Sequence, residues 1–169
     1  GVCLGALEYA LENHPIKACL FVLNFNNPLG ARMPDENKAR LVEMLAAREI
    51  PLIENDLYGD LSFEAVRPRT AKSFDRHGWV LLCDSFNKSL SCGYRVGWLA
   101  PGRFQAQVES IKFTTTEASA SLPQMALADF LANGRYDAHL RRLRGFYADQ
   151  VQRMTEAVAR LFPVSTKLT

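Results

Sequence analysis

The chain has 169 residues, of which 48% are hydrophobic and 22% charged, and its formal net charge is +2. This is the composition of one globular domain with a buried core, and it excludes a disordered chain or one whose charge demands nucleic acid or a membrane surface. No apolar run approaches the roughly 20 residues of a bilayer-spanning helix. The opening residues, Gly1-Val2-Cys3-Leu4, do not resemble a signal peptide, and the scattered, unpaired cysteines fit a reducing cytoplasm best.

The four cysteines are widely spaced and form no CxxC pair. A zinc site needs ligands at short spacing, and a disulfide framework usually belongs to a short secreted chain. We therefore expect no metal site. Cys19 and Cys83 lie inside apolar runs, which favours their interpretation as small buried hydrophobic residues.

Four short apolar runs are predicted to be β-strands. The first three do not alternate between apolar and polar residues, as is typical of strands buried on both faces of a sheet. The fourth follows the third after a loop too short for a crossover helix, which favours an antiparallel direction for it. The runs are 18–24, 51–56, 79–85 and 95–100.

A helix is predicted between the first two runs. Pro34 can take its first position, Asp35 and Glu36 lie near the positive end of the helix dipole, and Leu41 and Leu45 belong to an apolar stripe. A strand, a helix and a second strand in this order predict a right-handed crossover between parallel strands.

Further helices are predicted at 104–114 and 122–132, and a long one begins near Tyr136. In the long helix, apolar residues recur at spacings of three and four, so we expect one stripe to face a partner throughout. The basic cluster of Arg141, Arg142 and Arg144 is interpreted as a solvated or interface surface, and contact with a phosphate or nucleic acid is the alternative.

The chain also looks like part of a larger protein. It opens on a predicted helix, 7–11, with nothing before it to pack against, and it stops at 162–166, where a new strand is expected. A sheet of three or four strands would also leave edges exposed that natural domains cover.

Polar side chains follow the ends of the first three predicted strands. In an open α/β sheet the carboxyl ends of parallel strands share one crevice, where ligands bind. We therefore expect an amide, a carboxylate, a phenol, a hydroxyl and an amine to converge there, with a guanidinium close by. These groups belong to Asn27, Asp56, Tyr58, Ser85, Lys88 and Arg95.

Together these groups suit a phosphorylated aldehyde. A lysine in a cleft near Arg95 would have its charged form disfavoured, which would free the amine of Lys88 as a nucleophile and suits a Schiff base. Arg95 and the Ser85 hydroxyl suit a dianionic phosphate, and Tyr58 and Asn27 could donate to a phenolate oxygen. A carboxylate under a pyridine ring would keep the ring nitrogen protonated, which makes the ring an electron sink.

The ordered set resembles fold-type I pyridoxal-phosphate (PLP) aminotransferases of class I/II, over nearly the whole chain. The matching motifs are Asn27-Pro28-Leu29-Gly30, the Asp56/Tyr58 segment, Ser85-Phe86-Asn87-Lys88 and Arg95-Val96-Gly97-Trp98. The resemblance implies an α/β fold: part of a large domain with a mostly parallel sheet, flanking helices and three α/β/α layers.

The resemblance also implies roles for individual residues. Lys88 would hold PLP as an internal aldimine and, with Tyr58, would be catalytic. Ser85 and Arg95 would bind the phosphate, and Asn27 and Tyr58 would contact the ring oxygen.

The sequence departs from the family at the ring nitrogen. The family's aspartate usually comes three residues before the tyrosine, directly after a glutamate. That position is Asn55 here, and Asp56 is one further on. Either Asp56 reaches the ring nitrogen or Asn55 faces it, in which case the electron sink would be weaker.

The residues of these motifs most resemble the aminotransferase-like domain of MocR regulators. These regulators belong to the GntR superfamily and carry a winged helix-turn-helix N-terminal to that domain. This resemblance implies that residues 1–169 are the central part of a PLP-binding effector domain, without its N-terminal segment and C-terminal small domain. It also implies a homodimer, a small amine or amino acid as ligand, and DNA binding through a region outside this chain. Because part of the phosphate cradle would be missing, we expect the fragment alone not to bind PLP tightly.

An alternative is a free-standing PLP-dependent aminotransferase acting on amino acids. A metal or nucleotide enzyme of Rossmann type has little support, because no glycine-rich turn follows the first strand.

Overall fold

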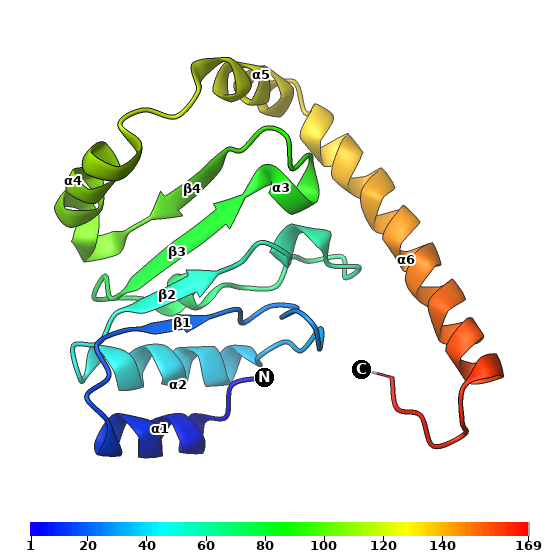
Figure 1. The fold of residues 1–169 in the computed structure, drawn as a ribbon, viewed down its shortest axis with the longest axis horizontal. Coiled ribbons are helices and arrows are strands. Elements are labelled where there is room, and N and C mark those ends of the chain that lie inside the picture. The colour runs from blue at the N-terminus through cyan, green and yellow to red at the C-terminus, as the bar shows by residue number, and fades with distance from the viewer. Residues whose placement is uncertain (169) are drawn as a thin grey trace.

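The computed structural model describes residues 1–168, which form one four-stranded sheet with helices around it (Figure 1). The strands are β1 (Cys19–Phe21), β2 (Leu52–Asn55), β3 (Val80–Ser85) and β4 (Gly97–Ala100). The helices are α1 (Leu4–Asn13), α2 (Asp35–Ala46), α3 (Phe86–Ser89), α4 (Gln105–Thr116), α5 (Ser121–Ala132) and α6 (Arg135–Leu161). Three short 3-10 helices are η1 (Gly59–Leu61), η2 (Ala71–Phe74) and η3 (Gly102–Phe104).

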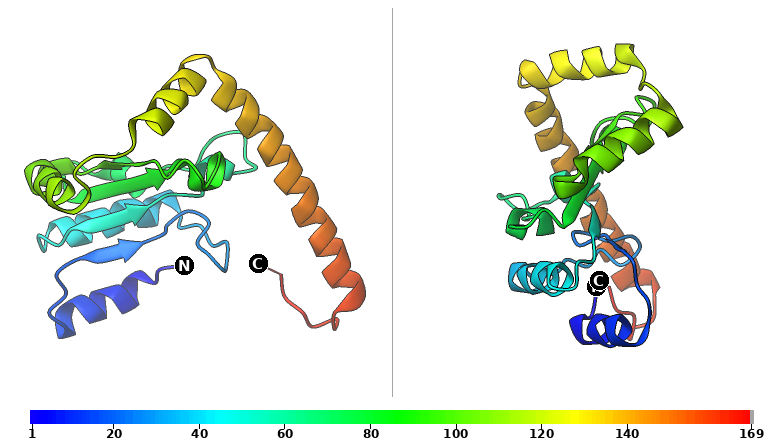
Figure 2. Two further views of the ribbon diagram at one scale, coloured as in Figure 1. Left: turned by 45° about the horizontal axis from the view of Figure 1, so that its top comes forward. Right: turned by 90° about the vertical axis from the view of Figure 1, so that its left-hand side faces the viewer.

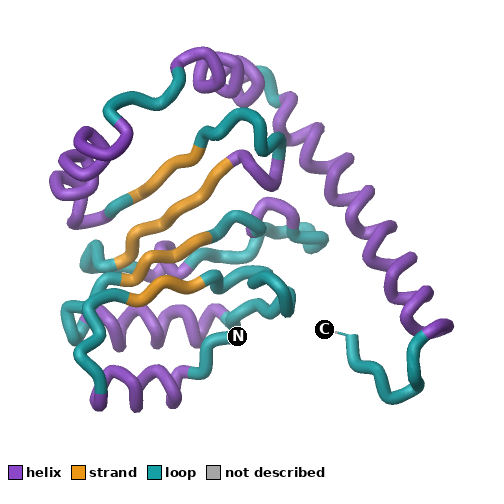
Figure 3. Tube along the Cα trace, viewed as in Figure 1, coloured by secondary structure: helices purple, strands orange, loops and turns teal. Residues whose placement is uncertain are grey.

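The sheet is mixed, and its strands lie in the order β1-β2-β3-β4. β1 and β2 run parallel, as do β2 and β3, whereas β4 pairs antiparallel with β3. The expected antiparallel direction of the fourth strand is therefore confirmed. The loops that follow β1 and β2 and the helix α3 that follows β3 gather at one end of the sheet (Figure 3).

The first strand is shorter than the apolar run that predicted it. The ladder ends at Phe21, and the chain then turns so that Asn24 is fully buried and Phe25 has a positive φ of 54°. The Asn24 amide donates to a buried carboxylate, Asp56, so this part of the run makes side-chain hydrogen bonds instead of continuing the ladder.

The hydrophobic core lies on one face of the sheet, which we call the shielded face. Leu41 and Leu45 of α2 pack there with Leu52 of β2 and Val80 of β3, and all four are at most 1% exposed. Figure 2 shows α2 beside this face of the sheet.

The opposite face, which we call the open face, is much less covered by the described chain. Side chains alternate along a strand, so the residues between the core positions point to this face. Leu20 is 65% exposed, and Ile53, Leu81 and Cys83 are only half-buried. The expectation that the first three strands are buried on both faces is therefore wrong for the described chain.

α6 leaves the sheet after its first turns (Figure 1). Leu140 is its one buried residue, and the apolar stripe continues through Val151, Met154 and Leu161, which are 53%, 64% and 70% exposed. The expected partner along the whole helix is therefore absent from residues 1–168. The strand expected at 162–166 does not form either, since this segment has only bends and turns. Within the part of the chain that the structure describes, no helix is long and apolar enough to cross a bilayer.

One carboxylate organises the loop that leads into β3. Asp75 accepts hydrogen bonds from the backbone N–H groups of His77, Gly78, Trp79 and Val80 at 2.8–3.2 Å, and Lys72 Nζ lies 2.9 Å from its Oδ2. Burial raises the pKa of Asp75, but the bonds from Lys72 and the backbone outweigh burial, so the pKa lies below its usual value. The ionised carboxylate thus holds the start of β3.

We predict that Asp75→Asn lowers the free energy of unfolding by about 2–4 kcal/mol at pH 7, because an amide loses the charge-assisted bonds and leaves Lys72 without its anion. Urea denaturation would measure the loss. The control is Asp149→Asn on the exposed surface of α6, which should change stability by less than about 0.5 kcal/mol. Equal effects of the two variants would contradict the role given to Asp75.

Candidate functional site

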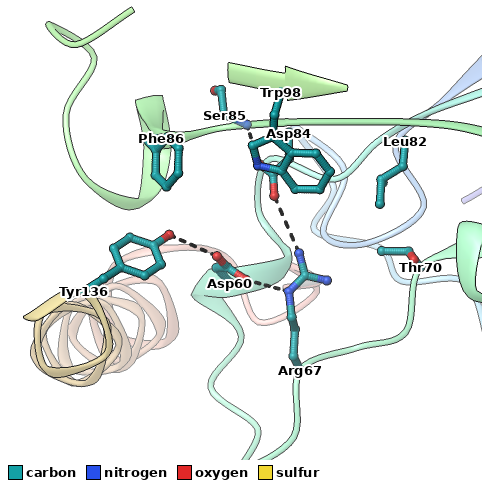
Figure 4. Close-up of a pocket in the computed structure, with 9 residues that line it drawn as sticks. All are labelled: Asp60, Arg67, Thr70, Leu82, Asp84, Ser85, Phe86, Trp98 and Tyr136. Atoms are coloured by element: carbon teal, nitrogen blue, oxygen red, sulfur yellow. Dashed lines mark hydrogen bonds and ion pairs between the residues drawn. The ribbon is translucent and has the colours of Figure 1, made fainter. Parts of the chain in front are cut away.

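The open face carries Asn55 at the end of β2 and Ser85 at the end of β3. Directly paired residues of parallel strands point to the same face, and Asn55 pairs with Cys83. Ser85, two residues further along β3, therefore shares the face of Asn55. Figure 4 shows the Ser85 side chain on the opposite side of β3 from Asp84 and Arg67.

α3 begins directly after β3 and brings Lys88 next to this end of the sheet. The Ser85 hydroxyl accepts from the Asn87 N–H at 3.4 Å and so caps α3. Lys88, on the short helix, is exposed. The connection to β4 then folds back, because the Phe86 N–H donates to the Val96 carbonyl at 3.2 Å. Ser85 and Lys88 are thus brought together by one tight turn.

Arg95 stands at the end of that connection in an unusual backbone conformation. Its φ is 54°, in the left-handed region that non-glycine residues rarely adopt, and its side chain is exposed. Such conformations cost about 1–3 kcal/mol and cluster at binding and catalytic sites. The strain supports a functional role for the loop that carries Arg95.

Asn27 and Tyr58 complete the predicted set. Asn27 lines a shallow hollow with Leu20 and Val22 beside β1, and it is exposed. Tyr58 is half-buried just before η1. Within residues 1–168 the side chains of Asn27, Tyr58, Ser85, Lys88 and Arg95 make no hydrogen bond to one another, so their polar groups are free to contact a ligand.

Asp56 and Asn55 lie on opposite faces of the sheet. Asp56 is 1% exposed and points to the shielded face. There its Oδ1 accepts from Asn24 Nδ2 at 2.8 Å, and its Oδ2 lies 2.7 Å from the Arg67 guanidinium. Burial raises the pKa of Asp56, and the Arg67 charge opposes that rise. Of the two side chains, Asn55 is the one on the face of Ser85.

The shielded face holds a charged network that sequence reasoning missed (Figure 4). Arg67 bonds to Asp60 at 2.5 Å and lies 3.7 Å from Asp84, at the wall of a cavity of about 410 Å³. Tyr136 of α6 donates its hydroxyl to Asp60 at 3.0 Å, and the same oxygen lies 2.7 Å from Ser89 Oγ.

The network links three segments that are distant in sequence. Asp60 follows Tyr58 by two residues and Ser89 adjoins Lys88, so Tyr136 joins the segment after β2 to α3. The Phe86 and Tyr136 rings also meet edge to face, with centroids 5.8 Å apart. These pairings span 47 to 76 residues of sequence, and no local pattern signals them.

Burial raises the pKa of Asp84 to about 6, and the nearby carboxylates of Asp60 and Asp56 push in the same direction, against the Ser85 N–H and Arg67. The network thus places three carboxyl groups, those of Asp56, Asp60 and Asp84, around one guanidinium. Among the described residues, no group of three or more His, Cys, Asp or Glu side chains could hold a metal ion.

We predict that Asp84→Asn stabilises the fold at pH 7 and leaves stability near pH 4 little changed. The carboxyl of Asp84 titrates near 3.8 when unfolded and near 6 when folded, so the folded state binds more protons between these pH values and wild-type stability falls as pH rises through them. Thermal unfolding at a series of pH values would measure this. Asp149→Asn is again the control, and a parallel pH profile for Asp84→Asn and wild type would contradict the prediction.

The predicted donor set fits PLP. A hydroxyl on Ser85 and a guanidinium on Arg95 suit a phosphate dianion, and the exposed amine of Lys88 suits an aldehyde carbon. Asn27 and Tyr58 add donors for a ring oxygen.

Proteins similar to this chain include aminotransferases and transcriptional regulators. The family model described as "Aminotransferase class I and II" matches residues 1–167. The chain is 42% identical over 168 residues to the HTH-type transcriptional regulator YdcR of Escherichia coli, covering 99% of this chain and 36% of YdcR. It is 41% identical over 169 residues to YjiR of the same organism, another HTH-type transcriptional regulator, covering 100% of this chain and 36% of YjiR. The chain thus spans little more than a third of these relatives.

Solved aminotransferases share the fold. A kynurenine aminotransferase of Pyrococcus horikoshii aligns with a TM-score of 0.91 and 25% identity, over 99% of this chain and 43% of that one. LysN, an α-aminoadipate aminotransferase of Thermus thermophilus, aligns with a TM-score of 0.87 and 28% identity, over 96% of this chain and 43% of that one. The predicted fold class, part of a fold-type I large domain with a mostly parallel sheet and flanking helices, is confirmed. The chain belongs to the aminotransferase class I and II family.

Proposed function

We propose that this chain is part of a PLP-binding, aminotransferase-like effector domain of a MocR/GntR-type transcriptional regulator, with the cofactor attached to Lys88. The observation that carries the proposal is the similarity over essentially the whole chain to HTH-type transcriptional regulators, at 41–42% identity. A third relative, the HTH-type transcriptional regulator NorG of Staphylococcus aureus, is 31% identical over 89% of the chain.

Each residue of the predicted set would contact a different part of the cofactor. Lys88 Nζ would form the covalent link, and Ser85 and Arg95 would hold the phosphate. Asn27 and Tyr58 would donate to the ring oxygen and orient the ring. PLP supplies an aldehyde that reacts with amines and a ring that withdraws electrons from the bound amine.

The partners of the whole protein follow from the same proposal. A small amine or amino acid would be the ligand, since it can displace Lys88 from the cofactor. DNA would be bound through a region outside these 169 residues. We also propose a homodimer in the cytoplasm.

The structural neighbours favour a second candidate, a free-standing aminotransferase acting on amino acids. The TM-score of 0.91 is to a protein named as a kynurenine aminotransferase. The residues encoded ahead of Gly1 discriminate between the two candidates: a winged helix-turn-helix supports the regulator, and an aminotransferase N-terminal segment starting at the initiator methionine supports the enzyme.

We predict that the full-length protein, mixed with PLP, shows an absorbance band near ~420 nm that Lys88→Ala abolishes, because the band requires the carbon–nitrogen double bond to the lysine. The matched control is Lys17→Ala, which changes an exposed lysine just before β1, at the opposite end of the sheet. Borohydride reduction followed by peptide mass mapping should find the cofactor on the peptide containing Lys88. A band that persists in Lys88→Ala would assign the cofactor to another lysine.

A further inference from the structure

The carboxyl end of β2 presents an amide to the open face. Asn55 pairs with Cys83, and its neighbours Glu54 and Asp56 point the other way. Glu54 pairs with Leu82, on the face where Val80 is 1% exposed within the core. The face that carries Ser85 therefore receives a neutral side chain from β2.

Each carboxylate near this point is held on the shielded face. Glu54 is fully buried and accepts from the Ala71 and Lys72 backbone N–H groups at 2.7 and 2.9 Å. Asp56 is bound by Asn24 and Arg67, as described above. Turning either carboxylate to the open face would break these contacts: Glu54 would leave two backbone N–H donors unpaired, and Asp56 would lose its bonds to Asn24 and Arg67.

Asp84 on β3 is held in the same way. Its Oδ1 accepts from the Ser85 N–H at 2.6 Å, and its Oδ2 faces Arg67 at 3.7 Å. Its neighbour across the antiparallel pair is Trp98, whose ring lines the shielded-face cavity. Asp84 therefore belongs to the Arg67 network and not to the Ser85 side of β3.

The Asn55 amide is also oriented. Its Oδ1 accepts from the Leu57 N–H at 3.4 Å, while Nδ2 has no hydrogen-bond partner within residues 1–168. An amide in this orientation offers N–H donors to a ligand. A donor matches a pyridine nitrogen that keeps its lone pair, and it cannot stabilise a protonated one.

From this geometry we infer that Asn55 Nδ2 donates to the ring nitrogen of PLP and holds that nitrogen unprotonated. The inference rests on the proposed function, since it requires PLP on the open face. A ring whose nitrogen is neutral withdraws electrons less strongly, so a bound amino acid keeps its Cα proton longer. Asn55 is thus a residue that favours holding a ligand over converting it.

The experiment uses full-length protein loaded with PLP that carries ¹⁵N in its ring. The ¹⁵N chemical shift of the bound ring is expected to be that of a neutral, hydrogen-bonded pyridine in wild type. In Asn55→Asp it should move to the position of a protonated pyridinium, because a carboxylate on the open face stabilises the positive charge. The shift reports the protonation state directly and does not depend on turnover.

The matched control is Asp56→Asn, which changes the neighbouring residue on the shielded face. It should leave the ¹⁵N shift at the wild-type position and lower the midpoint of thermal unfolding, since it weakens the pair with Arg67.

The inference is overturned by a pyridinium shift in wild type, by an unchanged shift in Asn55→Asp, or by a shift that responds to Asp56→Asn alone. The wild-type measurement stands even when a variant does not fold. Failure of the proposed function has a different signature, because the Lys88-dependent absorbance band is then missing from wild type. In that case the inference about Asn55 is also overturned, since it requires bound PLP.

Discussion

The site depends on one interaction, the pairing of Arg67 with carboxylates on the shielded face of the sheet. Arg67 contacts Asp56 and Asp60 at 2.7 and 2.5 Å, and Asp56 is 1% exposed. A one-residue slip of β2 would bring Asn55 under the sheet and leave the guanidinium without its buried partner, which is costly. The ion pair therefore reinforces the register that the core sets, and so determines which side chain reaches the open face.

The same network connects the site to α6. Tyr136 contacts Asp60 and Ser89, and the Arg144 guanidinium donates to the Asp60 carbonyl at 2.7 Å, so the start of α6 is bound to segments next to Tyr58 and Lys88. The rest of the helix extends past the sheet with its apolar stripe exposed. A movement of α3 would therefore displace the N-terminal end of α6, which is 27 residues long.

The elements of the fold could be predicted because their signals are local. Apolar runs marked all four strands, and a short loop marked the antiparallel one. The sequence did not predict which face of the sheet each side chain occupies, because β2 places Glu54 and Asp56 on the shielded face and Ile53 on the open face. Carboxylates are usually exposed and isoleucines buried, so β2 shows the opposite of the usual pattern. The buried carboxylates are tolerated because each is bound by partners distant in sequence. The motif residues were found by resemblance, whereas Arg67 and Tyr136 belong to no motif and emerge only from the fold.

The two faces of the sheet are therefore under different constraints: the shielded face must keep its ion pairs, and the open face must suit a ligand. On the shielded face the carboxylates stabilise the fold, since the buried Asp56 pairs with the Arg67 guanidinium at 2.7 Å. The charged members of the predicted set are Lys88 and Arg95, both cationic and exposed, which favours an anionic ligand. A carboxylate at position 55 would reduce that positive potential and protonate a pyridine ring, whereas an amide does neither. Because the side chain at this one position faces away from the core, its chemistry can differ between a catalyst and a sensor while the same ion pairs hold the fold.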